Sequence, residues 1–187
     1  MADFTVHTLD TAPEQSRDIL ARAALQFGFI PNLYAVMAEA PVLLKSYRRL
    51  SELLEGGRLS AAERQIVYLA VSQANLCHYC LAAHGALAAA TGLSEPVVAA
   101  VREGRRVDTP KFEALRRVTA ALVEKRGWLS EDDLSSFFGA GYGRDHLLEV
   151  IAGVGLKTMS NYTNHLAHTP VDEAFRKFEL AEGPRAR

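Results

Sequence analysis

The apolar residues of this chain recur every three to four positions in nearly every segment, which is the spacing of amphipathic helices. These stripes predict helices over 13–27, 33–40, 41–55, 60–73 and about 77–91, a short helix from 94, one over 109–122, and two more over 130–138 and 144–165. No segment alternates apolar and polar residues as a strand does, and there is no glycine-rich phosphate loop. The pattern therefore predicts an all-α fold, built as one compact multi-helix domain over residues 1–187.

Local signals mark several of the predicted helix ends. Ser60 and Glu63 have the spacing of a capping box, in which each side chain satisfies a backbone N–H of the first turn. Pro41 suits the first turn of a helix, and Gly56 and Gly57 end the same helix. These signals predict that short connections join the helices.

Two of the predicted helices suggest association between subunits. The helix over 144–165 is apolar on nearly all sides, so it is expected to be buried against several neighbours or against a second subunit. The helix over about 77–91 is rich in alanine, which lets another helix approach closely. We therefore expect a homo-oligomer.

Composition narrows the classes of partner and compartment. The formal net charge is −1 and no basic stripe is concentrated on one segment, so nucleic acid is not an expected partner. There is no basic segment followed by an apolar one at the start of the chain, and no apolar stretch approaches the length of a membrane span. We expect a soluble, cytoplasmic protein with no membrane partner.

The two cysteines of the chain, Cys77 and Cys80, stand with His84 at helical steps of three and four, so all three side chains are predicted to share one helix face. Helical neighbours three apart have Cβ atoms roughly 5 to 6 Å apart, which a modest adjustment brings to disulfide geometry. A reversible redox pair is favoured, because a disulfide closing so short a loop stabilises little and zinc needs more ligands. Simple core packing and a metal site are the alternatives that the residues leave open.

The segment over 60–84, SAAERQIVYLAVSQANLCHYCLAAH, resembles the alkylhydroperoxidase D-like branch of the carboxymuconolactone decarboxylase family. Residues 161–165 and the Thr169-Pro170 pair also resemble that branch. The resemblance implies an all-helical fold that assembles as trimers or hexamers. It also implies a peroxidase without a cofactor or metal, which reduces a hydroperoxide substrate through its cysteine pair. An external dithiol donor, in the best-known members a lipoyl domain, then regenerates the pair.

The family pattern places a glutamate twelve residues before the first cysteine, and this chain has Gln65 there. Glutamine can orient a water or an imidazole, but it cannot accept a proton as a carboxylate does. Glu63 points about 200° away around the helix and does not simply substitute. We therefore expect His84 to act as the base.

The expected catalytic set is Cys77, Cys80, His84 and Gln65. Cys80 is assigned as the thiol coupled to His84 and Cys77 as its disulfide partner, while the first cysteine to meet peroxide stays undecided. Oxidation would give a sulfenic acid, which the second cysteine converts to a disulfide before an external dithiol restores the pair. The predicted function is a thiol-dependent peroxidase. The alternatives are a dithiol–disulfide oxidoreductase and a non-catalytic, redox-sensing helical oligomer.

Overall fold

The computed structural model describes residues 3–180, and within this range it is helical with no strand. Its α-helices are α1 (Glu14–Phe27), α2 (Asn32–Met37), α3 (Pro41–Glu55), α4 (Ala61–Ala74), α5 (His78–Ala88), α6 (Glu95–Arg102), α7 (Pro110–Glu124), α8 (Glu131–Gly139) and α9 (Arg144–Ala167). Two 3-10 turns, η1 (Ala89–Thr91) and η2 (Glu173–Phe178), follow α5 and α9. The predicted all-α fold is confirmed.

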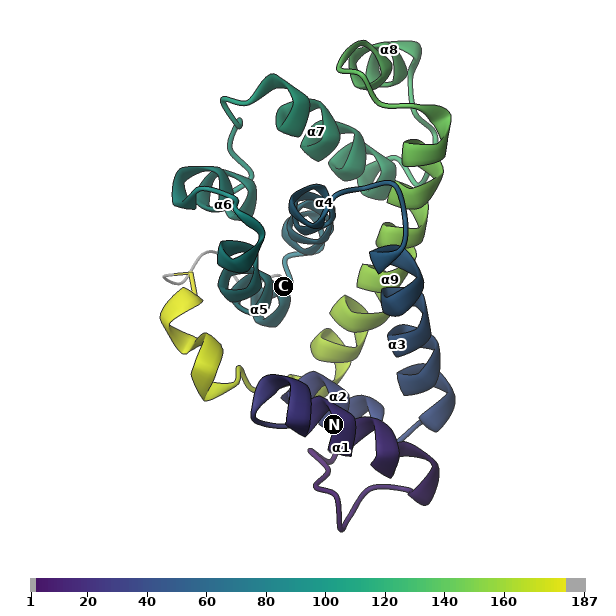
Figure 1. Ribbon diagram of the computed structural model, residues 1–187, viewed down its shortest axis with the longest axis vertical. Helices are drawn as coiled ribbons and strands as arrows, with labels where there is room; N and C mark the ends of the chain where they lie inside the picture. Colours follow the sequence, from purple (N-terminus) through teal and green to yellow (C-terminus); the bar gives the residue numbers. More distant parts are fainter. Residues whose placement is uncertain (1–2, 181–187) are drawn as a thin grey trace.

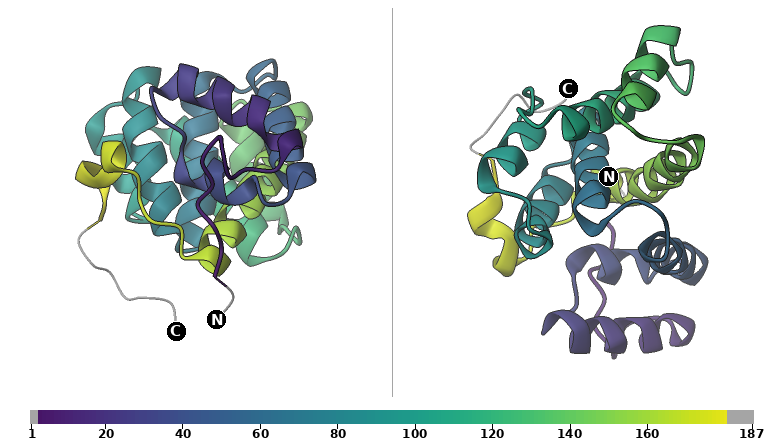
Figure 2. Two further views of the ribbon diagram at one scale, coloured as in Figure 1. Left: turned by 90° about the horizontal axis from the view of Figure 1, so that it is seen from below. Right: turned by 45° about the horizontal axis from the view of Figure 1, so that its top comes forward.

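Helix α4 lies at the centre of the molecule. It packs against α5, α6, α7 and α9, which surround it in Figure 1. Six of its consecutive positions, 66–71, are buried. Helices α1 and α2 lie together at one end of the molecule and α8 lies at the other (Figures 1 and 2). A helix that is apolar on every side can be stable in water only when neighbours cover it, and α4 has that environment.

The predicted capping box at the start of α4 is confirmed. Ser60 Oγ accepts a hydrogen bond from the backbone N–H of Glu63, and the Glu63 carboxylate accepts one from the backbone N–H of Ser60. Pro41 begins α3 as predicted. No helix within residues 3–180 is both long and apolar enough to cross a membrane.

The cysteine segment differs from the single helix that was predicted over about 77–91. Helix α5 begins at His78, and Cys77 is its N-cap residue with φ −87° and ψ 94°. Leu76 adopts a left-handed backbone with φ 55°, which turns the chain sharply between α4 and α5. The Cys77 backbone N–H donates to the Ser72 carbonyl at 2.8 Å, which fixes this turn. Cys80 and His84 share a helix face, whereas Cys77 approaches from the turn before the helix.

The sequence pattern suggested that helix α9 is apolar on nearly all sides, but the structure shows that it is not. Its buried face carries a row of polar side chains, namely Lys157, Ser160, Asn161 and Asn164. Its outer face exposes Leu148, Ile151, Tyr162 and Leu166. The average over both faces looks apolar, yet these four polar residues point inward and these four large apolar residues point outward. The inward polar row faces the cysteines.

The segment after α9 closes one side of the cysteine region. Asp172 accepts hydrogen bonds from the Asn32 backbone N–H at 3.0 Å and from the Tyr79 hydroxyl at 2.5 Å. The Tyr79 oxygen in turn accepts a bond from the Leu33 backbone N–H at 3.2 Å. These bonds join the C-terminal segment to α2 and α5, and η2 packs along α5.

Candidate active site

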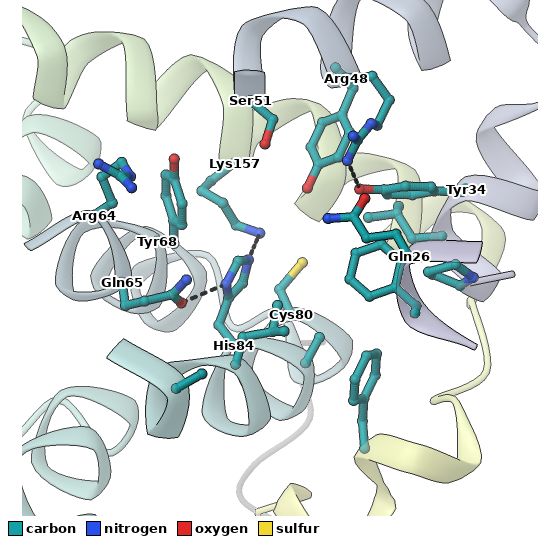
Figure 3. Close-up of a pocket in the computed structure, with 18 of the residues that line it drawn as sticks. Gln26, Tyr34, Arg48, Ser51, Arg64, Gln65, Tyr68, Cys80, His84 and Lys157 are labelled. Atoms are coloured by element: carbon teal, nitrogen blue, oxygen red, sulfur yellow. Dashed lines mark hydrogen bonds between the residues drawn. The ribbon is translucent and has the colours of Figure 1, made fainter. Parts of the chain in front are cut away.

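A cavity of about 560 Å³ opens beside the cysteine pair (Figure 3). Residues of α1, α2, α3, α4, α5, η1, α9 and η2 line it, so distant parts of the chain meet there. Much of its wall is aromatic, contributed by Phe27, Tyr34, Tyr47, Tyr68, Tyr79 and Phe175. A concave, mostly apolar cavity with a few converging polar groups is the usual form of a small-molecule site.

The two cysteines hold unequal positions at this cavity. Both are free thiols and both are buried, but only Cys80 lines the cavity. The Asn164 side-chain amide donates to the Cys80 sulfur at 3.3 Å and to the Cys77 sulfur at 3.8 Å. The Cys80 sulfur also lies 3.7 Å from Ser160 Oγ. One amide group therefore connects both sulfurs, and Cys80 is the one that a molecule in the cavity meets first.

The polar groups around the pair favour a thiolate at Cys80. Burial acts to raise the pKa of Cys80, but the hydrogen bond from Cys77, the Lys157 cation and Ser160 together hold this pKa well below its usual value. The hydrogen bond with Cys80 and burial raise the pKa of Cys77. These shifts favour a thiolate at the sulfur that faces the cavity and a protonated thiol behind it, the arrangement that a nucleophile and its disulfide partner require.

His84 takes part in a chain of hydrogen bonds rather than bonding to a cysteine. Lys157 Nζ lies 2.8 Å from His84 Nε2, and His84 Nδ1 lies 2.9 Å from Gln65 Oε1. An ammonium can only donate, so Nε2 is the acceptor and Nδ1 carries the ring proton that it donates to Gln65. Burial and the Lys157 cation lower the pKa of His84 well below its usual 6.5. The imidazole is therefore neutral and of fixed tautomer.

Lys157 is the functional residue that the sequence analysis missed. Its side chain is fully buried at 0% exposure, lines the cavity, and takes part in none of the ion pairs found among residues 3–180. A buried cation is costly without a counter-charge. Figure 3 shows the Lys157 ammonium, the His84 ring and the Cys80 sulfur turned toward the same space. A thiolate at Cys80 would supply the missing negative charge.

A sequence signal for Lys157 existed. Lys157, Ser160, Asn161 and Asn164 follow the i, i+3, i+4, i+7 spacing of one helix face within an otherwise apolar segment. Asn161 donates to Ser72 Oγ at 3.3 Å and accepts from the Asn75 side chain at 2.9 Å, which anchors α9 to the turn before Cys77.

The structure brings all four predicted site residues, Cys77, Cys80, His84 and Gln65, into this one cluster. The expected direct contact between His84 and Cys80 is replaced by Lys157, because both ring nitrogens of His84 bond elsewhere. Glu63 lies away from the cluster, where it caps α4 and pairs with Lys111 at 3.0 Å. Within residues 3–180, no three His, Cys, Asp or Glu side chains are grouped closely enough to hold a metal ion.

Comparison with known proteins agrees with this architecture. The sequence model of the carboxymuconolactone decarboxylase family matches residues 41–123, which include α4 and α5. No match was found among curated protein sequences. Three solved structures illustrate the fold.

The first is an uncharacterised peroxidase-related protein with an alkylhydroperoxidase D core, from Ralstonia eutropha JMP134. It has a TM-score of 0.83 and 22% identity over 92% of this chain and 93% of that one. The second, an uncharacterised peroxidase-related protein from Silicibacter sp. TM1040, has a TM-score of 0.75 and 18% identity over 93% and 92%. The third is a cysteine-to-alanine variant of the debrominase Bmp8 bound to 2,3,4-tribromopyrrole. It has a TM-score of 0.74 and 17% identity over 95% of each chain.

At these identities the structures show the fold alone, and the family model matches the segment that carries both cysteines. Residues 41–123 of this protein match the carboxymuconolactone decarboxylase family, and its fold is similar to that of the alkylhydroperoxidase D core.

Proposed function

We propose that this protein is a thiol-dependent peroxidase that reduces organic hydroperoxides and is regenerated by an external dithiol. The observation that carries the proposal is the position of Cys80. Its sulfur faces a 560 Å³ cavity, where the Lys157 cation and the Asn164 amide support a thiolate and Cys77 stands behind it. A nucleophilic thiolate with a resolving thiol is the minimum requirement for this chemistry.

In the proposed first step the Cys80 thiolate attacks the hydroxyl oxygen of the hydroperoxide. A sulfur–oxygen bond forms and the oxygen–oxygen bond breaks, which leaves a sulfenic acid on Cys80 and an alkoxide. The alkoxide takes a proton from the Lys157 ammonium and departs as the alcohol. Lys157 thus has two roles: it stabilises the thiolate before the reaction and supplies the proton that the leaving group needs.

In the second step the Cys77 thiol attacks the Cys80 sulfur. A disulfide forms, and the sulfenic hydroxyl leaves with the Cys77 proton as water. Reduction by an external dithiol returns two thiols, and the Cys80 proton passes to the Lys157 amine, so the starting charges are restored. Overall, one hydroperoxide and one dithiol yield one alcohol, one water and one disulfide.

The His84–Gln65 pair orients Lys157 in this mechanism. The neutral Nε2 accepts a hydrogen bond from the Lys157 ammonium and so orients it, while Gln65 holds the ring in the tautomer that leaves Nε2 unprotonated. A glutamine suffices for this purpose, because the role requires a hydrogen-bond acceptor and not a base. The departure from the family glutamate is therefore compatible with peroxidase activity.

The test is turnover of cumene hydroperoxide with dihydrolipoamide by the purified protein. We expect one dithiol to be oxidised for each hydroperoxide consumed, over many cycles. Cys80→Ser should abolish consumption, and Cys77→Ser should stop after one equivalent with a sulfenic acid on Cys80 that dimedone traps. A single equivalent consumed by the wild-type protein, without turnover, would instead favour the redox sensor. Disulfide exchange without hydroperoxide consumption would favour the dithiol–disulfide oxidoreductase.

A second candidate is reductive debromination of an aromatic ring. The aromatic walls beside Cys80 favour it, as does the similarity in fold to a debrominase solved with tribromopyrrole. Such a reaction would replace carbon–bromine by carbon–hydrogen while two thiols become a disulfide and hydrogen bromide is released. Bromide release from tribromopyrrole in the presence of dihydrolipoamide would favour this activity, and hydroperoxide turnover without bromide release would favour the peroxidase.

A further inference from the structure

We propose that the preferred substrate is a hydroperoxide whose body is an apolar ring and whose far end carries a carboxylate, with Arg48 as the residue that selects the carboxylate. This inference rests on the proposed peroxidase function and specifies its substrate class. It follows from the size of the cavity, from the chemistry of its walls and from the distribution of charge around Cys80.

The size and the walls of the cavity favour a substrate with a large organic group. A volume of about 560 Å³ lies within the range of roughly 300 to 1,000 Å³ that is typical of sites for drug-sized molecules. Hydrogen peroxide would leave most of it empty. Phe27, Tyr47 and Phe175 line the cavity and offer ring faces and edges. Aromatic side chains of this kind favour a planar ring in offset or edge-to-face contact.

Arg48 marks a polar end of the same cavity. It projects from α3, and one of its terminal nitrogens donates to the Tyr34 hydroxyl at 2.9 Å. Figure 3 shows Arg48 and Tyr34 together, with Gln26 nearby, on the opposite side of Cys80 from Arg64 and Gln65. The side chain of Arg48 is 22% exposed, so its guanidinium is sheltered from water yet faces the cavity.

Three cationic side chains, Arg48, Arg64 and Lys157, line the cavity against one carboxylate, that of Glu55. Lys157 acts on Cys80, and a terminal nitrogen of Arg64 donates to the Leu59 carbonyl, which is not part of the cavity wall. Arg48 pairs with the half-exposed carboxylate of Glu52 at 3.8 Å, and Glu55 also acts on its charge. A guanidinium has five N–H donors in a planar fork that fits a carboxylate, and Arg48 retains donors for one.

A binding experiment tests this class without requiring turnover. The probe is 4-(2-hydroxypropan-2-yl)benzoate, the alcohol that a carboxylated cumene hydroperoxide would leave, titrated calorimetrically into the reduced wild-type protein. The comparison probes are neutral 2-phenylpropan-2-ol and an analogue with a para-trimethylammonium group. We expect the carboxylate to bind about tenfold more tightly than the neutral alcohol, the size of effect typical of a charge-assisted hydrogen bond, and the cation to bind most weakly.

Arg48→Met should lower affinity for the carboxylate far more than affinity for the neutral alcohol, and Arg48→Lys should restore part of the preference. The matched control is Arg49→Met, because Arg49 is the next residue of α3, also pairs with Glu52 and is 71% exposed. Equal binding of all three probes by the wild-type protein would overturn the inference, as would an equal loss in Arg49→Met. Because no probe is a hydroperoxide, either result leaves the peroxidase test unaffected.

Discussion

Lys157 Nζ donates a hydrogen bond to His84 Nε2 over 2.8 Å, and this bond reverses the role expected for the histidine. A base that accepts a proton from Cys80 would need a free ring nitrogen facing the sulfur, whereas both nitrogens of His84 are occupied. The group that faces the Cys80 sulfur is the Lys157 ammonium. We therefore expect this positive charge, and not the imidazole, to lower the free energy of a Cys80 thiolate.

We predict that Lys157→Met raises the pKa of Cys80 by about one to three units, because an opposite charge at close range shifts a thiol by that much. The rate of iodoacetamide alkylation against pH measures this shift. Hydroperoxide turnover near neutral pH should fall at least about 10²-fold, since both the thiolate and the proton donor are lost. The control is Lys45→Met, a change at an exposed lysine of α3. An unchanged alkylation profile in Lys157→Met would contradict the role of the ammonium.

We predict that Gln65→Glu raises the pKa of His84 and increases turnover by less than about tenfold. A carboxylate at this position would stabilise a protonated ring through Nδ1, but Lys157 would still stand between that ring and Cys80. His84→Ala should lower thiolate formation far more than Gln65→Ala does, because it removes the acceptor that aims Lys157. Nuclear magnetic resonance titration of His84, together with alkylation rates of all three variants, checks this order. Equal losses of thiolate formation in the two alanine variants would show that Gln65 contributes as much as His84 to this chain of hydrogen bonds.

We predict that mild oxidation joins Cys77 and Cys80 in an intramolecular disulfide. The Asn164 amide already contacts both sulfurs, and the chain has no other cysteine to compete. Mass spectrometry of unreduced peptides should show the loss of two hydrogens within one fragment. With limiting alkylating reagent on the reduced protein, Cys80 should be modified before Cys77. Two free thiols after peroxide treatment would rule out the redox function.

We predict that Glu63 contributes to stability only above acidic pH. Its pKa in the folded protein is about 2: burial acts to raise this pKa, but the hydrogen bonds with Ser60 and Lys111 lower it by more. A folded pKa below the usual 4.5 gives a stabilisation that is fully present above about pH 4.5 and is lost as the pH falls toward 2. Glu63→Gln should cost about 0.5 to 2 kcal/mol at pH 7, as other lost caps do, and flatten this acid dependence. Urea unfolding at pH 7, 4 and 3 measures both effects.

We predict a trimer or a hexamer in solution. The outer face of α9 exposes Leu148 by 66% and Leu166 by 69%, with Ile151 and Tyr162 between them, which is a large apolar stripe for a surface helix. Light scattering at micromolar concentration gives the mass. Leu148→Glu combined with Leu166→Glu should lower it, whereas Glu131→Gln on α8 should not. A wild-type monomer at that concentration would exclude the assembly.

The sequence by itself determined the helices and the close spacing of the two cysteines. Helical periodicity, the Ser60–Glu63 capping box and the Pro41 start are local properties of the chain, and local rules predict them. The proximity of Cys77, Cys80 and His84 also follows from short-range spacing. The start of α5 at His78, one residue later than predicted, also depends on the local backbone. The pattern of side chains does not reveal that Leu76 adopts a left-handed conformation.

Only the tertiary structure decided what surrounds the cysteines. Lys157 and Asn164 lie about eighty positions further along the chain than Cys80, and they reach it because α9 packs its polar row against the turn between α4 and α5. Arg48 reaches the same cavity from α3. Which face of α9 turns inward depends on the combined packing of α2, α3, α4 and α7 against it, a free energy that no single segment contains. That packing placed an ammonium beside the Cys80 sulfur, where an imidazole was expected.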